Sequence, residues 1–142
     1  MLFQPGRNCP ADLPCRHGNL GLCGPIGTSF SACAASAQAI AEGLRTIQRG
    51  EADVAIVGGH DSMVHPLGML SFVVLGALSP EACRPFDAHR DGFSIGEGAA
   101  VLVLERADRA AARRHRPRAK LLGAGTSADA YAATAPHPQG VG

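Results

Sequence analysis

The stretch from Ile26 to Gly59, IGTSFSACAASAQAIAEGLRTIQRGEADVAIVGG, decides the fold class. Its first residues, 26–31, are small and compatible with a short strand, and residues 32–49 carry an apolar stripe at helical spacing. A continuous apolar run follows at residues 53–59, as in strands that are buried on both faces of a parallel sheet. The succession predicts a right-handed βαβ crossover and therefore an α/β fold.

Further segments are expected outside this unit from their composition and spacing. They are a short helix or loop at residues 66–74, an ordered loop at 84–98, another buried strand at 99–105, a basic helix at 107–116 and a further strand at 119–124. Residues 1–19 carry three prolines and no periodicity, so we expect irregular chain there.

The composition excludes several classes of function. The chain has 142 residues, enough for one compact domain, and its net charge of +1 gives no strong field to attract nucleic acid or an anionic membrane. No apolar run is long enough to span a membrane and no signal peptide is visible, so we expect a cytoplasmic protein. The five cysteines are an odd number with irregular spacing, which favours reduced thiols over a disulfide framework.

Cys33 is the strongest candidate for chemistry, because small residues flank it and a helix is expected to begin at or just before it. The N–H groups and the positive dipole end of a helix start favour a thiolate, the nucleophilic form of cysteine. The same N–H groups can stabilise the oxyanion of an attacked thioester. On the local pattern alone, a buried cysteine that packs a strand–helix joint remains the alternative.

Four runs then follow one another along the chain. They are GPIGTSFSACAASAQAIAEGL at 24–44, GEADVAIVGGHDSM at 50–63, a run containing RPFD, RDGF and GEGA at 65–105, and AKLLGAGTSADAYAATAPHPQG at 119–140. Together they resemble the β-ketoacyl-acyl-carrier-protein synthases, the condensing enzymes of fatty acid and polyketide synthesis, over residues 20–142. The resemblance implies an α/β, partial thiolase-like fold, with the later part of the N-terminal half up to about residue 117 and the first strand of the C-terminal half within 118–142.

The resemblance also implies a reaction. Cys33 would accept an acyl group from acyl carrier protein, and the carbanion from decarboxylated malonyl carrier protein would then attack the Cys33 thioester. No metal or organic cofactor is expected, because the phosphopantetheine arm belongs to the carrier protein. The family forms homodimers, so acyl carrier protein and a second copy are the expected partners, with no nucleic acid and no membrane.

Other positions follow from the same resemblance. Gly68 and Phe72 match residues that line the acyl pocket, although Phe72 fits a core aromatic equally well. Thr134 matches a residue at the phosphopantetheine entrance, but Ala135 stands where the family often has a second hydroxyl. In the loop at 84–98, charged residues are expected to hold the backbone by ion pairs and hydrogen bonds, namely Arg84, Asp87, Arg90 and Asp91.

The family's two catalytic histidines and supporting lysine match no position of this chain. The histidines in the matching region do not replace them: we expect surface or loop positions for His60, His65 and His89, a place in the basic helix for His115 and a place in the tail for His137. We therefore expect a partial synthase in which acyl transfer is possible and condensation is incomplete. The alternatives are a non-catalytic module that binds a carrier protein or a synthase subunit, and a remnant that does not fold stably.

A second constellation offers zinc ligand types near the N-terminus. Its members are spaced as C-x5-C-x-H-x5-C, and they are Cys9, Cys15, His17 and Cys23. Structural zinc sites use tighter cysteine pairs, so we expect no metal here.

Overall fold

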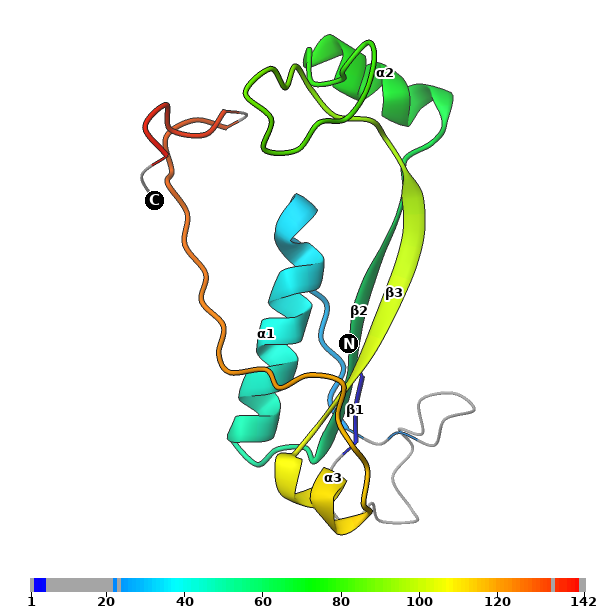
Figure 1. Cartoon of the computed structure of the whole chain (residues 1–142), viewed down its shortest axis with the longest axis vertical. Coiled ribbons are helices and arrows are strands. Elements are labelled where there is room, and N and C mark those ends of the chain that lie inside the picture. Colours follow the sequence, from blue (N-terminus) through cyan, green and yellow to red (C-terminus); the bar gives the residue numbers. More distant parts are fainter. Residues whose placement is uncertain (1, 5–21, 23, 134, 141–142) are drawn as a thin grey trace. The chain divides into compact units, whose positions relative to one another are not determined.

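The computed structural model describes residues 2–4, 22, 24–133 and 135–140. Its elements, labelled in Figure 1, are β1 (Leu2–Gln4), η2 (Ala32–Ala34), α1 (Ala35–Gln48), β2 (Val54–Ser62), α2 (Pro66–Val74), β3 (Glu97–Glu105) and α3 (Ala107–Ala112). The strands form one sheet in the order β1-β2-β3, and the predicted α/β class is confirmed. The chain divides into two compact units, the first up to Val57 and again from Leu102, the second from Gly58 to Val101.

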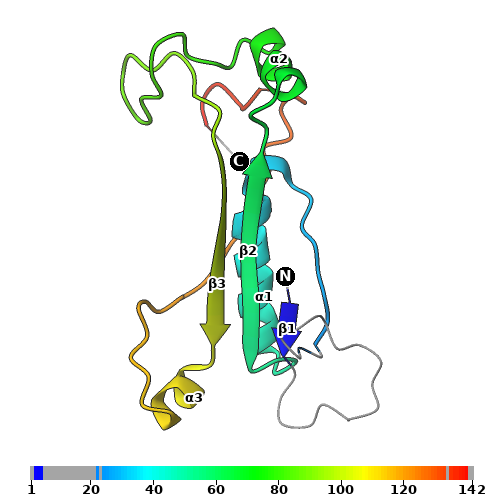
Figure 2. The same cartoon turned by 90° about the vertical axis from the view of Figure 1, so that its right-hand side faces the viewer.

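The sheet is not the parallel sheet that the sequence predicted. β1 pairs with β2 in antiparallel register, with Leu2 opposite Ile56, and Figure 2 shows the arrows of β2 and β3 running in opposite directions. The predicted strand at 26–31 does not form and contributes only an isolated bridge at Ile26, whereas β1 pairs with residues 54–56 of β2 and β3 lies on the other side of β2. The βαβ prediction was therefore wrong, as was irregular chain for Leu2–Gln4.

The core of the first unit lies between α1 and one face of β2. Ala52, Ala55 and Val57 are buried, and Ile40, Ile47 and Leu104 pack against them. Burial alternates at the start of β2, so this strand buries one face rather than the two that were predicted. The predicted helix at 32–49 is confirmed as a 3-10 turn followed by α1.

Two predictions of burial and pairing fail on the C-terminal side. Strand β3 forms as predicted but is largely exposed, with Val101 and Val103 each 66% accessible. Residues 119–124 form no strand, and Leu122 is 83% accessible. An apolar run shows that a segment can tolerate burial, whereas burial itself requires a covering layer and strand formation requires a paired backbone.

Helix α3 ends at Ala112, four residues before the predicted end at Arg116. Arg114 adopts a positive φ of 55°, which turns the chain out of the helix. Its N–H donates to the carbonyl of Ala111 at 2.9 Å, and the N–H of His115 donates to the carbonyl of Ala110 at 2.9 Å. This pair of bonds closes the helix as a Schellman motif, with arginine in the place usually taken by glycine.

The second unit contains α2 and an ordered loop. The segment at 66–74, predicted as helix or loop, is a helix. The predicted role of the charged loop residues is confirmed: Arg84 lies 3.4 Å from Asp91, and the Arg90 guanidinium donates to the carbonyl of Asp87. Hydrogen bonds from Ser79 and Arg84 lower the pKa of the Asp91 carboxyl below its usual range. Among the described residues, no helix has the length and apolarity needed to cross a membrane.

Candidate functional site

Cys33 lies in η2, the 3-10 turn that leads directly into α1, and its side chain is exposed. The N–H of Ala34 donates to the carbonyl of Ser31 at 3.0 Å, and the N–H of Ala35 donates to the carbonyl of Ala32. These bonds hold the backbone on both sides of the thiol. The predicted placement of Cys33 at a helix start is therefore correct, and its thiol faces solvent rather than packing a buried joint.

The backbone directly before Cys33 is strained. Ala32 has a φ of 47°, in the left-handed region that a non-glycine residue adopts at a cost. The hydroxyl of Ser31 is buried and has no hydrogen-bond partner. Such local costs persist where the surrounding structure holds them, and they are common at functional sites. The thiol of Cys33 therefore follows directly after a backbone conformation that is unfavourable for an alanine.

The start of α1 supplies the local electrostatics of the thiol. Neither η2 nor α1 has a side-chain cap, so no hydroxyl or carboxylate competes for the helix start. The helix is 14 residues long, and its positive dipole end lies beside Cys33. The N–H groups of Ala34 and Ala35 are already engaged within the turn, so the predicted oxyanion donors are not these two. The arrangement can present a nucleophilic sulfur to an electrophilic carbonyl.

Gly68 and Phe72 both belong to α2, in the second unit, whereas Cys33 belongs to the first. Gly68 is buried, and a Cβ built on it would lie 2.5 Å from the carbonyl oxygen of Met63. The Phe72 ring packs edge to face on Phe93, with centroids 5.3 Å apart. Their role in an acyl pocket stays a prediction, but each residue has a definite packing role in this unit.

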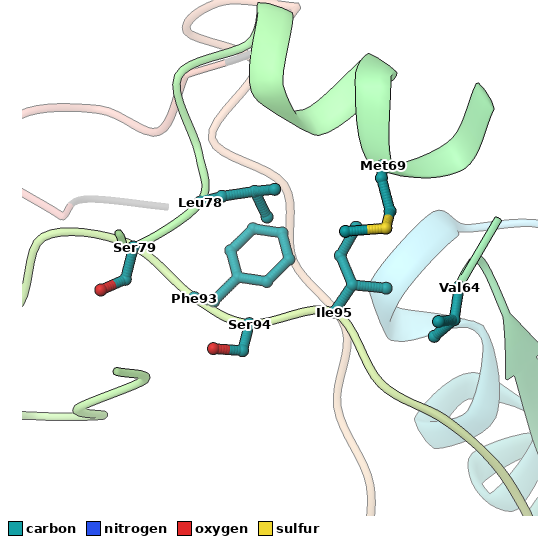
Figure 3. Close-up of a pocket in the computed structure, with 7 residues that line it drawn as sticks. All are labelled: Val64, Met69, Leu78, Ser79, Phe93, Ser94 and Ile95. Carbon is teal, nitrogen blue, oxygen red and sulfur yellow. The ribbon is translucent and has the colours of Figure 1, made fainter. Parts of the chain in front are cut away.

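A pocket of about 220 Å³ lies beside α2 in the same unit (Figure 3). It is mainly apolar, and its lining residues are Val64, Met69, Leu78, Ser79, Phe93, Ser94 and Ile95. Figure 3 shows the side chain of Met69, from α2, pointing toward Ile95. Phe93 lines the pocket and also contacts Phe72, so Phe72 supports the pocket wall without lining it.

Two predicted groups lie outside the described residues. They are Thr134 and the possible zinc ligands Cys9, Cys15, His17 and Cys23. Within the described part of the chain, no three His, Cys, Asp or Glu side chains are grouped so that they could hold a metal ion.

Near the C-terminal end of the first unit, one carboxylate joins residues of the segments 129–133 and 135–140. Asp129 accepts hydrogen bonds from the N–H groups of Tyr131 and His137, and these bonds lower the pKa of its carboxyl. The Tyr131 and His137 rings pack edge to face at 4.9 Å. Asp129 therefore fixes the described residues on either side of position 134.

His65 is a residue whose role the sequence prediction missed. It is exposed and lies in the bend before α2, as expected, and its imidazole also caps the N-terminus of α2 by accepting the N–H of Gly68 at 3.2 Å. The signal was present in Pro66, because proline favours the first position of a helix and places the cap one residue earlier. The prediction overlooked it because histidine is not among the preferred capping residues.

Comparison with known proteins shows the family to which the chain belongs. Residues 17–110 match the beta-ketoacyl synthase N-terminal domain. The chain is 42% identical over 129 residues to 3-oxoacyl-[acyl-carrier-protein] synthase 2 of Staphylococcus aureus, covering 87% of this chain and 32% of that protein. It therefore spans about a third of the length of the curated relatives it matches.

The solved structures that resemble this chain include ketosynthases. The structure matches the ishigamide ketosynthase/chain length factor with a TM-score of 0.70 and 44% identity, over 76% of this chain and 27% of that one. It matches a type II PKS acyl-carrier protein in complex with its ketosynthase, bound to the hexaketide, with a TM-score of 0.65 and 33% identity, over 68% and 25% of the two chains. The exposed thiol at the start of α1 lies within the matched domain. The chain belongs to the β-ketoacyl synthase family, and it carries part of that family's α/β fold.

Proposed function

We propose that this chain is the nucleophile-bearing part of a 3-oxoacyl-[acyl-carrier-protein] synthase, and that Cys33 is the residue that carries the acyl group. The observation that supports this most strongly is the exposed Cys33 thiol, held in a strained turn at the uncapped start of a 14-residue helix. The S. aureus relative is named for the same activity.

Acyl transfer begins when the Cys33 sulfur attacks the carbonyl carbon of a thioester carried by acyl carrier protein. A carbon–sulfur bond forms and the carbonyl electrons move to oxygen, giving a tetrahedral oxyanion. When the carbonyl reforms, the bond to the phosphopantetheine sulfur breaks. That sulfur leaves with the electron pair and takes the proton that Cys33 gave up. The products are an acyl-Cys33 thioester and a free carrier thiol.

Condensation would follow on the acylated cysteine. Malonyl carrier protein loses carbon dioxide, and the electrons of the broken carbon–carbon bond attack the thioester carbonyl, which releases the Cys33 thiolate. The resemblance assigns charge stabilisation in this step to two histidines and a lysine that match no position among the 142 residues. We therefore propose that a polypeptide of this sequence alone accepts an acyl group but forms little or no 3-oxoacyl product.

Acyl carrier protein is the proposed partner, as in the solved complex of a ketosynthase with its carrier protein. The mechanism uses a thiol, a thioester and a carbon dioxide leaving group, so we propose that it needs no metal or organic cofactor held by this chain. A homodimer in the cytoplasm is proposed by analogy with the family.

Incubation of the chain with octanoyl carrier protein, followed by intact-mass measurement, tests the proposal. We expect a mass increase of one octanoyl group on the wild type and none on Cys33→Ala. Addition of malonyl carrier protein should give little 3-oxodecanoyl product. A wild-type chain that is not acylated but still binds carrier protein would instead support the non-catalytic module. Robust 3-oxoacyl product would overturn the expectation that condensation needs further residues.

A further inference from the structure

Helix α2 begins at an unusual cap. The Nδ1 atom of His65 accepts the N–H of Gly68 at 3.2 Å, and the His65 carbonyl accepts the N–H of Met69 at 2.9 Å. Pro66 occupies the first helical position, where the missing N–H is no loss. His65 itself has extended backbone, with φ −145° and ψ 160°, as a capping residue should. One imidazole thus does what a serine or aspartate side chain usually does.

The cap requires a residue without a Cβ at position 68. A Cβ at this position would lie 2.5 Å from the Met63 carbonyl oxygen and 3.1 Å from Nε2 of His65. The carbonyl belongs to the backbone and cannot move away as a flexible side chain could. Gly68 therefore leaves room for the Met63 carbonyl and the His65 ring while it donates its own N–H to that ring. This packing accounts for Gly68 without any contact to a substrate.

The cap matters because α2 has few other local supports. The helix has nine residues, with no acidic side chain in its first turn and no basic side chain in its last. Helices of this length are marginal without capping or tertiary packing. Its other end is closed by a Schellman motif, in which Gly76, at φ 64°, donates to the Val73 carbonyl and Ala77 donates to the Phe72 carbonyl.

The position of α2 determines where Met69 and Phe72 lie relative to the pocket. Met69 lies one turn after the cap and lines the pocket, while Phe72 packs against Phe93, another residue of the pocket lining. Phe93 is tied to the segment after the helix, since its N–H donates to the Ala77 carbonyl and its carbonyl accepts the Ser79 N–H, each at 3.0 Å. A displaced first turn would therefore move Met69 directly and disturb the Phe72–Phe93 contact.

We infer that His65 is a positioning residue for acyl-chain selection, because its imidazole fixes the first turn of α2 and thereby Met69, which lines the pocket, and Phe72, which supports the pocket residue Phe93. This inference rests on the proposed function and on the resemblance, which implies that Gly68 and Phe72 of α2 belong to the acyl pocket. His65 acts through the helix and not on the reacting atoms. Its effect should grow with the length of the acyl chain, since a two-carbon group needs little of an apolar pocket.

The test compares His65→Ala, which removes the cap, with His65→Ser, which restores an acceptor by different chemistry. His60→Ala is the matched control, because His60 is an exposed histidine of β2 in the same unit. Amide hydrogen exchange at Gly68 and Met69 reports the cap without any substrate. Loss of one cap should raise exchange in His65→Ala about fivefold. His65→Ser and His60→Ala should exchange at the wild-type rate.

The second measurement is the ratio of Cys33 acylation rates with octanoyl and acetyl carrier protein. We expect the ratio to fall about fivefold in His65→Ala and to recover in His65→Ser. Unchanged exchange in His65→Ala, or a ratio that does not depend on the cap, would overturn the inference. If the wild type is not acylated at all, the proposed function and the selection role fail together, while hydrogen exchange still decides whether His65 caps α2.

Discussion

Asp53 and Arg109 join the start of β2 to α3 through an ion pair in which Oδ2 and Nη1 lie 2.6 Å apart. Arg106 approaches the other carboxylate oxygen at 3.7 Å, and its backbone N–H donates to the Asp53 carbonyl. The Asp53 side chain is only 16% exposed, so this carboxylate is screened less by solvent than an ion pair between two exposed side chains. It ties two segments of the first unit that lie about fifty residues apart.

Replacement of Asp53 by Asn should therefore lower the free energy of unfolding by about 1–2 kcal/mol, because two arginines lose their shared acceptor. Urea unfolding followed by circular dichroism measures the change. Glu97→Gln is the control, since Glu97 is exposed, and it should shift the midpoint very little. Equal effects of the two substitutions would show that the Asp53 ion pairs contribute nothing specific.

Gly43 marks the closest approach of α1 to the sheet. A Cβ there would lie 2.5 Å from Cγ1 of Val57, which is fully buried, and 3.1 Å from Cδ1 of Leu104. Gly43→Ala gains about 1 kcal/mol of helix propensity, but crowding costs about 1–3 kcal/mol, so we expect a net loss. Gly98→Ala, with no atom near its Cβ position, should be tolerated in the same unfolding assay. A stabilised Gly43→Ala variant would contradict this packing.

The pair of Glu105 and Arg113 predicts a dependence of stability on pH. Arg113 donates to both carboxylate oxygens, and these hydrogen bonds lower the pKa of Glu105 in the folded chain. The stabilisation is therefore complete above the unfolded pKa of a glutamate, about 4.3, and is lost as the pH falls through the lower folded value.

Arg113→Gln should remove this contribution, so its deficit against the wild type should be largest near neutral pH and should shrink below about pH 4. Urea midpoints at several pH values measure it, with Arg116→Gln, at an exposed position, as the control. A deficit of Arg113→Gln that stays constant with pH would show that Glu105 is not the titrating partner.

Substitutions of Ala32 test whether the strained turn before Cys33 positions its thiol. Glycine accepts a positive φ without cost, so Ala32→Gly should keep the rate of Cys33 acylation within about twofold. A β-branched residue is poorly tolerated at a φ of 47°, and Ala32→Val should slow acylation about tenfold. Stopped reactions analysed by intact mass give both rates. Equal rates for the glycine and valine variants would mean that the turn does not position the thiol.

The sequence predicted the elements that depend on local pattern. The helix after Cys33, the strand that follows it and the strand at β3 all form, because apolar periodicity and continuous apolar runs reflect the geometry of each element. The ordered loop with Arg84 and Asp91 was predicted because it is rich in Gly, Asp and Arg, and its opposite charges pair as expected.

Most of the errors concern features that depend on distant parts of the chain. Which strand pairs with β2, and in which direction, depends on segments distant in sequence, and Leu2–Gln4 carried no periodic signal. Burial of β3 and strand formation at 119–124 likewise depend on what covers or pairs with them. At the site, Cys33 was identified because its neighbours matched a family, whereas Pro66 marked a helix start without indicating that His65 would cap it, because histidine seldom takes that role.

Peptide mapping after acyl transfer identifies the residue that carries the acyl group. Two free cysteines, Cys33 and Cys83, are exposed in the described part of the chain. Acyl transfer that depended only on the exposure of a thiol would therefore modify both. After incubation with octanoyl carrier protein, digestion and tandem mass spectrometry, we predict an octanoyl thioester on Cys33 alone, with Cys83→Ser unaffected and Cys33→Ser unlabelled. Acyl groups spread over both cysteines, or found on Cys83 instead, would contradict the assignment of Cys33 as the nucleophile.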